Sequence, residues 1–378
     1  MARLQFHGVG LKQTRSPMIS VAYYISGHGF GHAVRSLQLI RSLKERCAEL
    51  EFYIRSPTPK WLMDHLPFPL SYERRTTDVG IVQPDSLAMD VEGTLRSCQE
   101  LHERIPSITE EELAFIQREK IRLVLGDVPP LCFEIARRAT LPSVAIANFS
   151  WDWIYRAYLP EFPSFRPLIE EMEVFYHQAT LCLSLPFSCD LDVFPRRVSI
   201  PLIARISTLN KQQARERFDL PITAKIVLAS FGGCGLERLP WETIRQYGDF
   251  FFVTTGPLRR KEKNFLVLPD PLANYEDLIR AADVVISKPG YGVVTDVIAH
   301  QVPLLYTSRG PFPEYPFLVE ALNQWATSEF IPQEELLAGN LGPYLERLLE
   351  KEPNWPTVPL NGAQVAAEKI LELLKENA

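Results

Sequence analysis

Two histidines in a glycine-rich loop are the side chains of this chain best suited to proton transfer. Residues 26–32 read Ser-Gly-His-Gly-Phe-Gly-His, so His28 and His32 lie between a strand-like run at 19–25 and a helical run that starts at 32. Three glycines allow a tight turn and a close backbone approach to a ligand. An imidazole has an ordinary pKa of about 6.5 and accepts a proton near neutral pH. The loop therefore predicts a general base at the floor of a binding site.

Two further glycine loops are of the kind that binds phosphate. Residues 232–235, Gly-Gly-Cys-Gly, follow the strand-like run 225–231, and Lys-Pro-Gly-Tyr-Gly at 288–292 precedes a helical run. Backbone N–H groups in such loops face anions, and a helix N-terminus adds about half a positive charge. Together with Lys288, they predict a site for a diphosphate. Simple turn formation explains either loop taken alone.

Strand-like and helical runs alternate along the whole chain, which is the pattern of parallel α/β sheets. In the first half we expect strands at 19–25, 51–55, 70–73, 122–126, 143–147 and 180–184, and helices at 32–46, 94–118, 130–139 and 164–178. In the second half we expect strands at 225–231, 250–254, 265–268, 283–287 and 302–307, and helices at 275–281, 291–300, 314–324, 333–351 and 362–375.

Each half opens with strand, glycine loop and helix, so the pattern predicts an α/β fold of two Rossmann-like βαβ domains that face each other across a cleft. A chain of 378 residues also exceeds one ordinary hydrophobic core. We expect a flexible extension at 1–17, a first domain at 18–195, a linker at 196–210, a second domain at 211–362 and a terminal helix at 363–378.

Composition excludes several classes of protein. A net charge of −6 argues against a nucleic-acid-binding protein, which needs a basic face. We expect no transmembrane segment, because no apolar run approaches the roughly 20 residues that cross a bilayer. The first 17 residues hold no apolar core of a signal peptide. The six cysteines form no CxxC pair, so we expect no zinc site and a cytoplasmic location.

Several motifs resemble the GT-B glycosyltransferases, most closely those of the MurG-like type. The motifs are Gly31-His32 before a helix, Gly232-Gly233 after the first strand of the second half, and the run from Ser287 to Asp296. Four sequence segments are similar to the glycosyltransferase-like N-terminal half of plant L-arabinokinases: residues 26–35, 126–129, 148–155 and 288–296. The resemblance covers most of residues 18–375 and implies the GT-B fold.

The resemblance implies an inverting, metal-independent glycosyltransferase. Such an enzyme moves a sugar from a nucleoside diphosphate sugar, most often a UDP-sugar, to an acceptor hydroxyl, and it has no further cofactor. His32 matches the Gly-His position of the family and is the implied base, and Asp127 resembles the aspartate that orients it. His28 is the alternative base, or it shapes the loop. The competing role for His32 is a place beside the helix N-cap or a phosphate contact, and the competing role for Asp127 is to cap the helix that follows residues 129–130.

The resemblance assigns the donor to the second half. Asp296 matches an acidic residue of the family that binds the nucleotide ribose. The resemblance also implies that Glu314 contacts the hydroxyls of the donor sugar and that Arg309 contacts its phosphate. Val293 is apolar where the family often has a hydroxyl residue, which removes one phosphate contact. The complete implied donor set is Gly232, Gly233, Gly235, Lys288, Gly290, Tyr291, Gly292, Asp296, Arg309 and Glu314.

An aromatic segment at 148–155 suggests where the acceptor binds. Aromatic faces suit sugar rings and carboxylates suit hydroxyls, although hydrophobic packing is the commoner use of such a segment. The residues that we expect in this acceptor wall are Phe30, Asn148, Trp151 and Asp152. Asp190 and Asp192 form a DxD pattern, but the pattern does not follow a donor-binding strand, and we expect no metal there.

Two other functions fit the same motifs. One is a non-catalytic module that binds a nucleotide sugar for regulation. The other is a nucleotide-sugar epimerase or hydrolase, because one fold hosts several activities. An epimerase needs further acid and base groups around the donor sugar, and Glu314 is the one candidate that the sequence offers.

Overall fold

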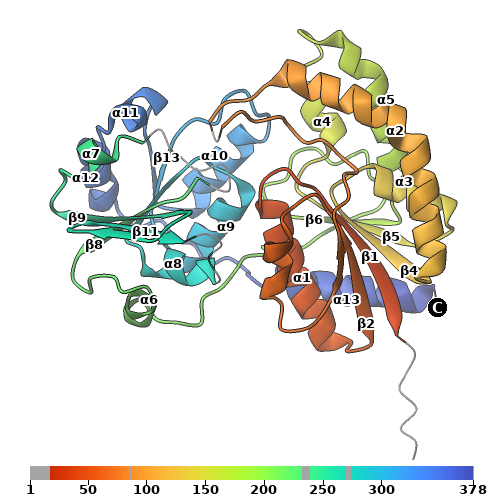
Figure 1. The fold of residues 1–378 in the computed structure, drawn as a ribbon, viewed down its shortest axis with the longest axis horizontal. Coiled ribbons are helices and arrows are strands. Elements are labelled where there is room, and N and C mark those ends of the chain that lie inside the picture. The colour runs from red at the N-terminus through yellow and green to blue at the C-terminus, as the bar shows by residue number, and fades with distance from the viewer. Residues whose placement is uncertain (1–17, 86, 232–238, 270–271, 273, 378) are drawn as a thin grey trace, which may run out of the picture.

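Two seven-stranded sheets, one in each half of the chain, form the framework of the protein (Figure 1). The computed structural model describes residues 18–85, 87–231, 239–269, 272 and 274–377. The predicted donor residues Gly232, Gly233 and Gly235 lie outside this described part. The two βα domains that the sequence predicts are confirmed.

The first sheet is wholly parallel and has the order β3-β2-β1-β4-β5-β6-β7. Its strands are β1 (Ile19–Ile25), β2 (Leu50–Arg55), β3 (Ser71–Glu73), β4 (Ile121–Asp127), β5 (Ser143–Ala147), β6 (Leu181–Ser184) and β7 (Arg197–Ser199). The chain runs outward from β1 in one direction to β3 and then returns to β4 on the other side. The sheet therefore has a topological switch point between β1 and β4.

The second sheet repeats this plan in the order β10-β11-β9-β8-β12-β13-β14. Its strands are β8 (Lys225–Ala229), β9 (Phe250–Gly256), β10 (Arg260–Glu262), β11 (Phe265–Pro269), β12 (Val284–Ser287), β13 (Leu304–Tyr306) and β14 (Ser328–Phe330). All described pairs are parallel except β10 with β11, which form an antiparallel edge. The switch point of this sheet lies between β8 and β12.

Strand β1 illustrates why these sheets are covered on both faces. Val21, Tyr23 and Ile25 belong to one buried apolar cluster, whereas Ala22 and Tyr24 belong to another. Side chains alternate across a strand, so the two clusters lie on opposite faces of the sheet. Because both faces of β1 are buried, nearly all of its residues are apolar. Such a run in the sequence indicates a buried parallel strand.

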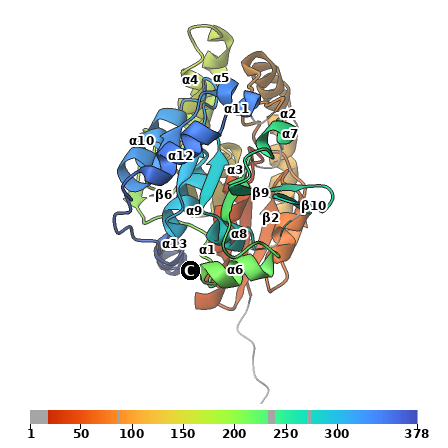
Figure 2. The ribbon, with the colours of Figure 1, turned by 90° about the vertical axis from the view of Figure 1, so that its left-hand side faces the viewer.

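Helices cover both faces of the sheets. In the first half they are α1 (Gly31–Arg46), η1 (Lys60–His65), α2 (Val91–Arg118), α3 (Leu131–Arg138), α4 (Trp151–Arg156), η2 (Pro163–Phe165) and α5 (Arg166–Tyr176). In the second half they are α6 (Lys211–Arg217), α7 (Trp241–Ile244), α8 (Tyr275–Ala281), α9 (Tyr291–His300), α10 (Tyr315–Trp325), α11 (Gln333–Ala338), α12 (Gly342–Glu350) and α13 (Gly362–Glu376). Helix α13 returns to the first half and packs against α1 (Figures 1 and 2).

The structure adds short elements that the hydrophobic pattern does not mark. The segment 196–210, expected as a linker, contributes β7 to the edge of the first sheet. Helix α6 is polar along its length, although Asn210 and Gln213 form a capping box that marks its start. The helix expected at 333–351 is two helices, since Gly339 takes a φ of +81° between α11 and α12.

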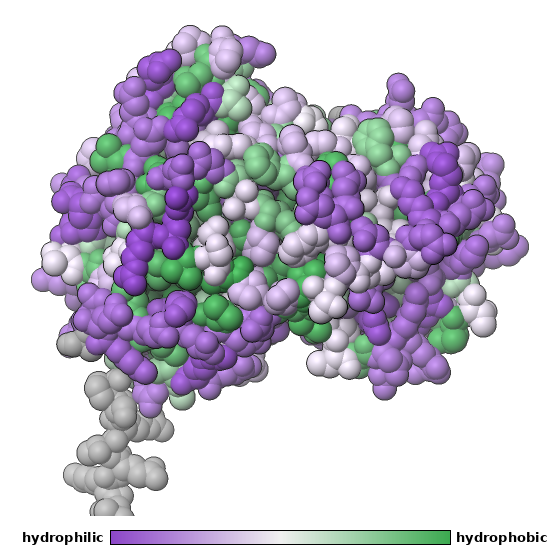
Figure 3. All heavy atoms as spheres, turned by 180° about the vertical axis from the view of Figure 1, so that it is seen from behind, coloured by the Kyte–Doolittle hydropathy of each residue, from purple (hydrophilic) through white to green (hydrophobic). Residues whose placement is uncertain are grey.

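Within the described residues, no helix is both long enough and apolar enough to cross a bilayer. Seen from behind, hydrophilic side chains cover most of both lobes, and apolar ones collect mainly toward the middle of the molecule (Figure 3).

Candidate active site at the two switch points

The two switch points meet each other across the contact between the two halves. Helix α1 follows β1, helix α9 follows β12, and the two helices are in contact. A Cβ atom built on Gly292 would lie 3.5 Å from Cα of Gly31, so the two backbones approach closely. The Arg35 guanidinium lies over the Tyr291 ring, 5.1 Å from its centroid. The first residues of α1 and α9 thus form one shared site.

His32 and Asp127 come together as the sequence predicts. The His32 Nδ1 atom lies 2.7 Å from Asp127 Oδ1, and both side chains are buried, with 6% and 0% of their surface exposed. Burial by itself raises the pKa of Asp127, but the charges of Arg35 and His32 bring it below its ordinary value. An ionised carboxylate only accepts hydrogen bonds, so the imidazole donates from Nδ1.

This pairing fixes which imidazole nitrogen is basic. Arg35 Nη2, which can only donate, also lies 3.1 Å from His32 Nδ1, but the shorter contact of 2.7 Å with the carboxylate assigns the hydrogen to Nδ1. Neutral His32 then has a lone pair on Nε2, and within the described part of the chain Nε2 forms no hydrogen bond. An imidazole held in one tautomer by a carboxylate is chemically able to accept a proton at its other nitrogen.

Arg35 and Ser36 belong to this cluster, and the sequence reasoning missed both. Its Nε lies 2.7 Å from Asp127 Oδ2 and its Nη2 lies 2.5 Å from Asp127 Oδ1, a two-pronged ion pair. Ser36 adds a hydroxyl bond of 3.2 Å to the same carboxylate. Arg35 stands three residues after His32 on α1, a spacing that puts both on one helix face, and this spacing is the signal that marks it.

A buried polar chain continues from Arg35 into the second half. Asn148 accepts a bond of 2.7 Å from Arg35 Nη1 and donates one of 2.6 Å to Glu314 Oε1. Glu314 Oε2 in turn accepts from Arg309 Nη1 at 3.0 Å. Asn148 and Glu314 are almost fully buried. The structure therefore brings together three residues that the sequence assigned to separate acceptor and donor sites.

His28 occupies a different place from His32. Its Nδ1 accepts a bond of 3.2 Å from the Ile81 N–H, and its ring stacks on Phe312 at 5.4 Å. Burial, followed by the charge of Arg309, holds the pKa of His28 well below its ordinary value, so this ring is neutral. Gly29, the next residue, has a φ of +73°, which favours glycine.

The turn between β12 and α9 carries the predicted phosphate-binding residues. Gly290 is the N-cap residue of α9 and has an extended backbone, so the N–H groups of the first turn are not used within the helix. Lys288 is half-buried and close enough to His28 to lower its pKa. Tyr291 is buried, and its hydroxyl has no partner among the described residues.

Asp296 is paired with Arg205, which the sequence reasoning also missed. Arg205 Nη2 binds Asp296 Oδ2, and its Nε lies 3.4 Å from Oδ1. The Arg205 guanidinium also lies over the Tyr275 ring, 5.1 Å from its centroid. Arg205 stands in the segment between the sheets, and no periodic pattern marks it. Only the packing of that segment on α9 reveals the pair.

The four residues expected in the acceptor wall do not share one surface. Trp151 is fully buried, donates from Nε1 to Asp78 Oδ2 at 2.8 Å, and meets His28 edge-on. Phe30 packs edge-on against Trp61. Asp152 lines a separate hollow. Asn148 is the member of the set that joins the His32 cluster.

No metal-binding cluster is formed by the histidine, cysteine, aspartate and glutamate side chains of the described residues. Asp192 pairs with Arg197, and Asp190 Oδ1 accepts from the Asp192 N–H at 2.8 Å. The DxD segment is thus held by its own local contacts.

Comparison with known proteins gives one curated relative and many similar structures. L-arabinokinase of Arabidopsis thaliana is 28% identical over 359 residues, which is 93% of this chain and 34% of the plant protein. This chain thus spans about a third of the length of that relative. No protein-family model matches the chain.

Several solved structures have the same architecture, and a glycosyltransferase is among them. The glycosyltransferase of kitacinnamycin superposes with a TM-score of 0.60 at 16% identity, covering 95% of this chain and 96% of that one. Phytolacca americana UGT2 gives a TM-score of 0.57 at 14% identity, covering 95% and 94%. Acinetobacter baumannii MurG gives 0.54 at 13% identity, covering 94% and 100%. The protein has the GT-B glycosyltransferase fold.

Proposed function

We propose that this protein is an inverting glycosyltransferase that moves a sugar from a nucleoside diphosphate sugar to an acceptor hydroxyl without a bound metal. The observation that carries the proposal is the buried His32–Asp127 pair beside the glycine turn that opens α9. The complex of Phytolacca americana UGT2 with UDP-2fluoro-glucose, which has the same fold, supports UDP as the carrier.

The proton acceptor in this reaction is His32. Its Nε2 takes the proton of the acceptor hydroxyl while that oxygen forms a bond to the anomeric carbon of the donor. The bond from the anomeric carbon to the diphosphate oxygen breaks on the opposite side, so the configuration inverts. Asp127 holds the ring and offsets the charge of the imidazolium, and such help is typically worth 10²–10⁴-fold in rate.

The departing diphosphate is stabilised by the turn before α9. Lys288 supplies a positive charge, and the N–H groups at the start of α9 supply donors and the positive end of a helix dipole. Glu314 and Arg309 form a buried ion pair of the second half, and Arg309 reaches His28, so we assign Glu314 to the donor sugar and Arg309 to its phosphate. Their present bonds to Asn148 and to each other exchange for bonds to the donor.

A second candidate function is a module that binds a nucleotide sugar without transferring it. The Arg35 guanidinium favours this candidate, because it contacts both oxygens of Asp127 and offsets the charge that stabilises an imidazolium. Such a module binds the nucleotide sugar but releases no diphosphate from it. Turnover at the site therefore separates the two functions.

Nucleotide sugars should stabilise the protein when EDTA is present throughout. At about 100 times its Kd, a ligand that binds only the folded state adds about 2.7 kcal/mol to the free energy of unfolding. The measurement is the melting temperature with a panel of UDP-, GDP- and TDP-sugars, followed by assay of diphosphate release for each hit. A panel that leaves the melting temperature unchanged argues against both functions, and loss of the effect in EDTA argues against metal independence.

Replacement of Asp296 by asparagine should weaken the affinity for UDP at least about tenfold, which corresponds to about 1.4 kcal/mol. We assign Asp296 to the nucleotide ribose, since its Oδ1 has only the long 3.4 Å contact with Arg205. Calorimetry with UDP measures the effect. Arg205→Gln is the matched control, because it breaks the same ion pair and keeps the carboxylate. Equal losses of affinity in both variants would assign the effect to folding.

A further inference from the structure

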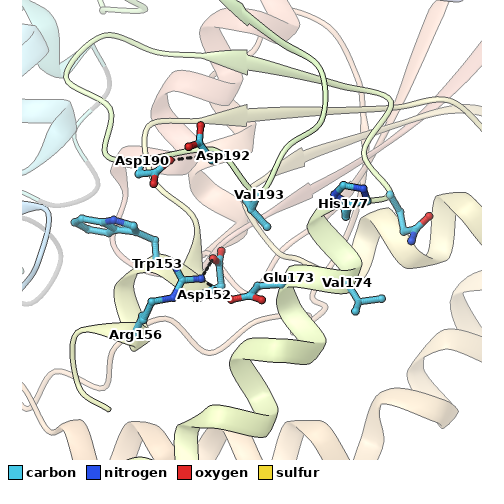
Figure 4. Close-up of a pocket in the computed structure, with 10 residues that line it drawn as sticks. Asp152, Trp153, Arg156, Glu173, Val174, His177, Asp190, Asp192 and Val193 are labelled. Atoms are coloured by element: carbon cyan, nitrogen blue, oxygen red, sulfur yellow. Dashed lines mark hydrogen bonds and ion pairs between the residues drawn. The ribbon is translucent and has the colours of Figure 1, made fainter. Parts of the chain in front are cut away.

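A hollow of about 600 Å³ opens on the first domain, away from the His32–Asp127 pair (Figure 4). It is formed by α4, the C-terminal end of α5 and the segment that follows β6. Neither His32 nor Asp127 lines it. Phe149, just before α4, meets the His32 ring at 5.6 Å, whereas Asp152 and Trp153 face the hollow. The short segment 149–153 thus contacts His32 at one end and lines the hollow at the other.

Three of the four carboxylates that line the hollow are paired with arginines. Arg156 Nη2 lies 3.2 Å from Asp152 Oδ2 and also binds Glu173, as the dashed lines of Figure 4 mark. Asp192 is paired with Arg197 at the rim. Two arginines thus face four carboxylates, so the wall keeps a net negative charge, which repels a phosphorylated ligand.

Asp152 has an oxygen without a partner. The residue is only 2% exposed, and its Oδ1 is buried without a hydrogen bond of standard geometry among the described residues. Burial raises the pKa of this carboxyl, and the nearby Ser150 hydroxyl lowers it in part. Buried polar atoms are almost always satisfied, and Asp152 lines the hollow, so we infer that its carboxylate accepts from a donor that enters there. At the exposed side, Asp190 Oδ1 is used by a backbone N–H, and among the described residues Asp190 forms no ion pair.

An aromatic ring completes the wall. Trp153 is half-buried, lines the hollow, and packs edge-on against Phe317 of α10 at 5.5 Å. Val174 and Val193 add apolar surface, and Gln178 adds an amide. Hydroxyl donors suit the carboxylates, and the C–H face of a pyranose suits an indole.

We propose that this hollow is a binding site for a neutral polyhydroxylated ligand, a mono- or disaccharide unit, held by Asp152, Asp190 and Trp153. Asp152 Oδ1 accepts from a ligand hydroxyl, Asp190 accepts at the open side, and the ring of the ligand packs on Trp153. The site is separate from sugar transfer, and its occupation needs no nucleotide.

The test is ¹⁹F NMR of the full chain carrying 5-fluorotryptophan. Trp153→Phe assigns the Trp153 resonance among those of the six tryptophans. Glucose, galactose and lactose should each be titrated, with spermidine and glucose 6-phosphate as charged probes. We expect a saturable shift of the Trp153 resonance with at least one neutral sugar and none with spermidine or the phosphate. Asp152→Asn should weaken that sugar roughly tenfold.

Asp190→Asn keeps the test decisive if Asp152→Asn does not fold, because Asp190 is exposed. It should weaken the same sugar severalfold, whereas Asp64→Asn, which removes an exposed carboxylate of η1, should not. Three results would overturn the proposal: no shift with any neutral sugar, a shift with a charged probe alone, or unchanged sugar affinity in both variants at the hollow. None of these measurements depends on transferase activity.

Discussion

Replacement of His32 by alanine should lower the turnover number for sugar transfer by at least about a hundredfold and leave the affinity for the nucleotide nearly unchanged. The proton of the acceptor hydroxyl then has no imidazole to move to, and general-base catalysis is worth 10²–10⁴-fold. His32 belongs to the first domain and pairs with Asp127, whereas the phosphate-binding turn belongs to the second. A loss in turnover without a loss in binding is the mark of a group used in the transition state.

Diphosphate release from the donor selected by the nucleotide-sugar panel measures turnover, and calorimetry measures affinity. His102→Ala is the matched control, because His102 pairs with Glu171 through an equivalent 2.8 Å contact at an exposed position. His28→Ala addresses the alternative base. A large loss with His28→Ala and none with His32→Ala would move the proton transfer to His28. Full turnover in both variants would leave the transfer without a histidine base.

Replacement of Arg35 by methionine should lower the free energy of unfolding at neutral pH by about 3–5 kcal/mol. Arg35 and Asp127 are both buried, and removal of one partner leaves an unpaired charge in the interior. The change also removes the donor to Asn148 Oδ1, at the contact with the second half. Urea denaturation at pH 7 measures the effect. Arg197→Met, which breaks an exposed pair with Asp192, should cost less than about 1 kcal/mol.

The stability lost with Arg35 should depend on pH. In the natural protein the pKa of Asp127 lies below its ordinary value of 3.8, because Arg35 and His32 outweigh burial. The stability from its ionisation is therefore present above pH 3.8 and lost as the pH falls through the folded pKa. In the Arg35→Met variant, burial raises the pKa of Asp127. Ionisation of this buried carboxylate then lowers the free energy of unfolding of the variant as the pH rises.

The difference in unfolding free energy between Arg35→Met and the natural protein should thus narrow from pH 8 to pH 5. Denaturation curves at several pH values in this range measure it. A difference that stays constant would mean that Asp127 keeps its low pKa through His32 alone. A difference that widens toward pH 5 would contradict the assignment of the charge to Asp127.

The sequence by itself determined the framework and one half of the site. Uninterrupted apolar runs mark buried parallel strands, and the first strand of each half is followed by glycines and a helix. His32 follows β1, and Asp127 ends β4, which pairs with β1. Adjacent parallel strands end at the same edge of a sheet, so these two side chains had to meet. A local pattern was enough because the sheet geometry is regular.

Only the tertiary structure decided the charge partners. Arg35 stands in the middle of an amphipathic helix, and the period of that helix does not show which charges lie inside. Its bonds to Asp127 and Asn148 join residues 92 and 113 positions apart, and Asn148 meets Glu314 across 166 positions. Such pairs form because a buried charge needs a partner, and the partner is selected by how the two halves pack.

The sequence also could not predict the hollow beside Trp153, because the packing of separate elements forms it. Asp152 directly follows Trp151 in the sequence, but successive residues of a helix point in different directions. Trp151 therefore lies near His28, whereas Asp152 lines the hollow. The short elements β7 and α4 carry too few residues to show a period. Periodicity specifies which face of an element is buried, and the three-dimensional packing of elements specifies what that face contacts.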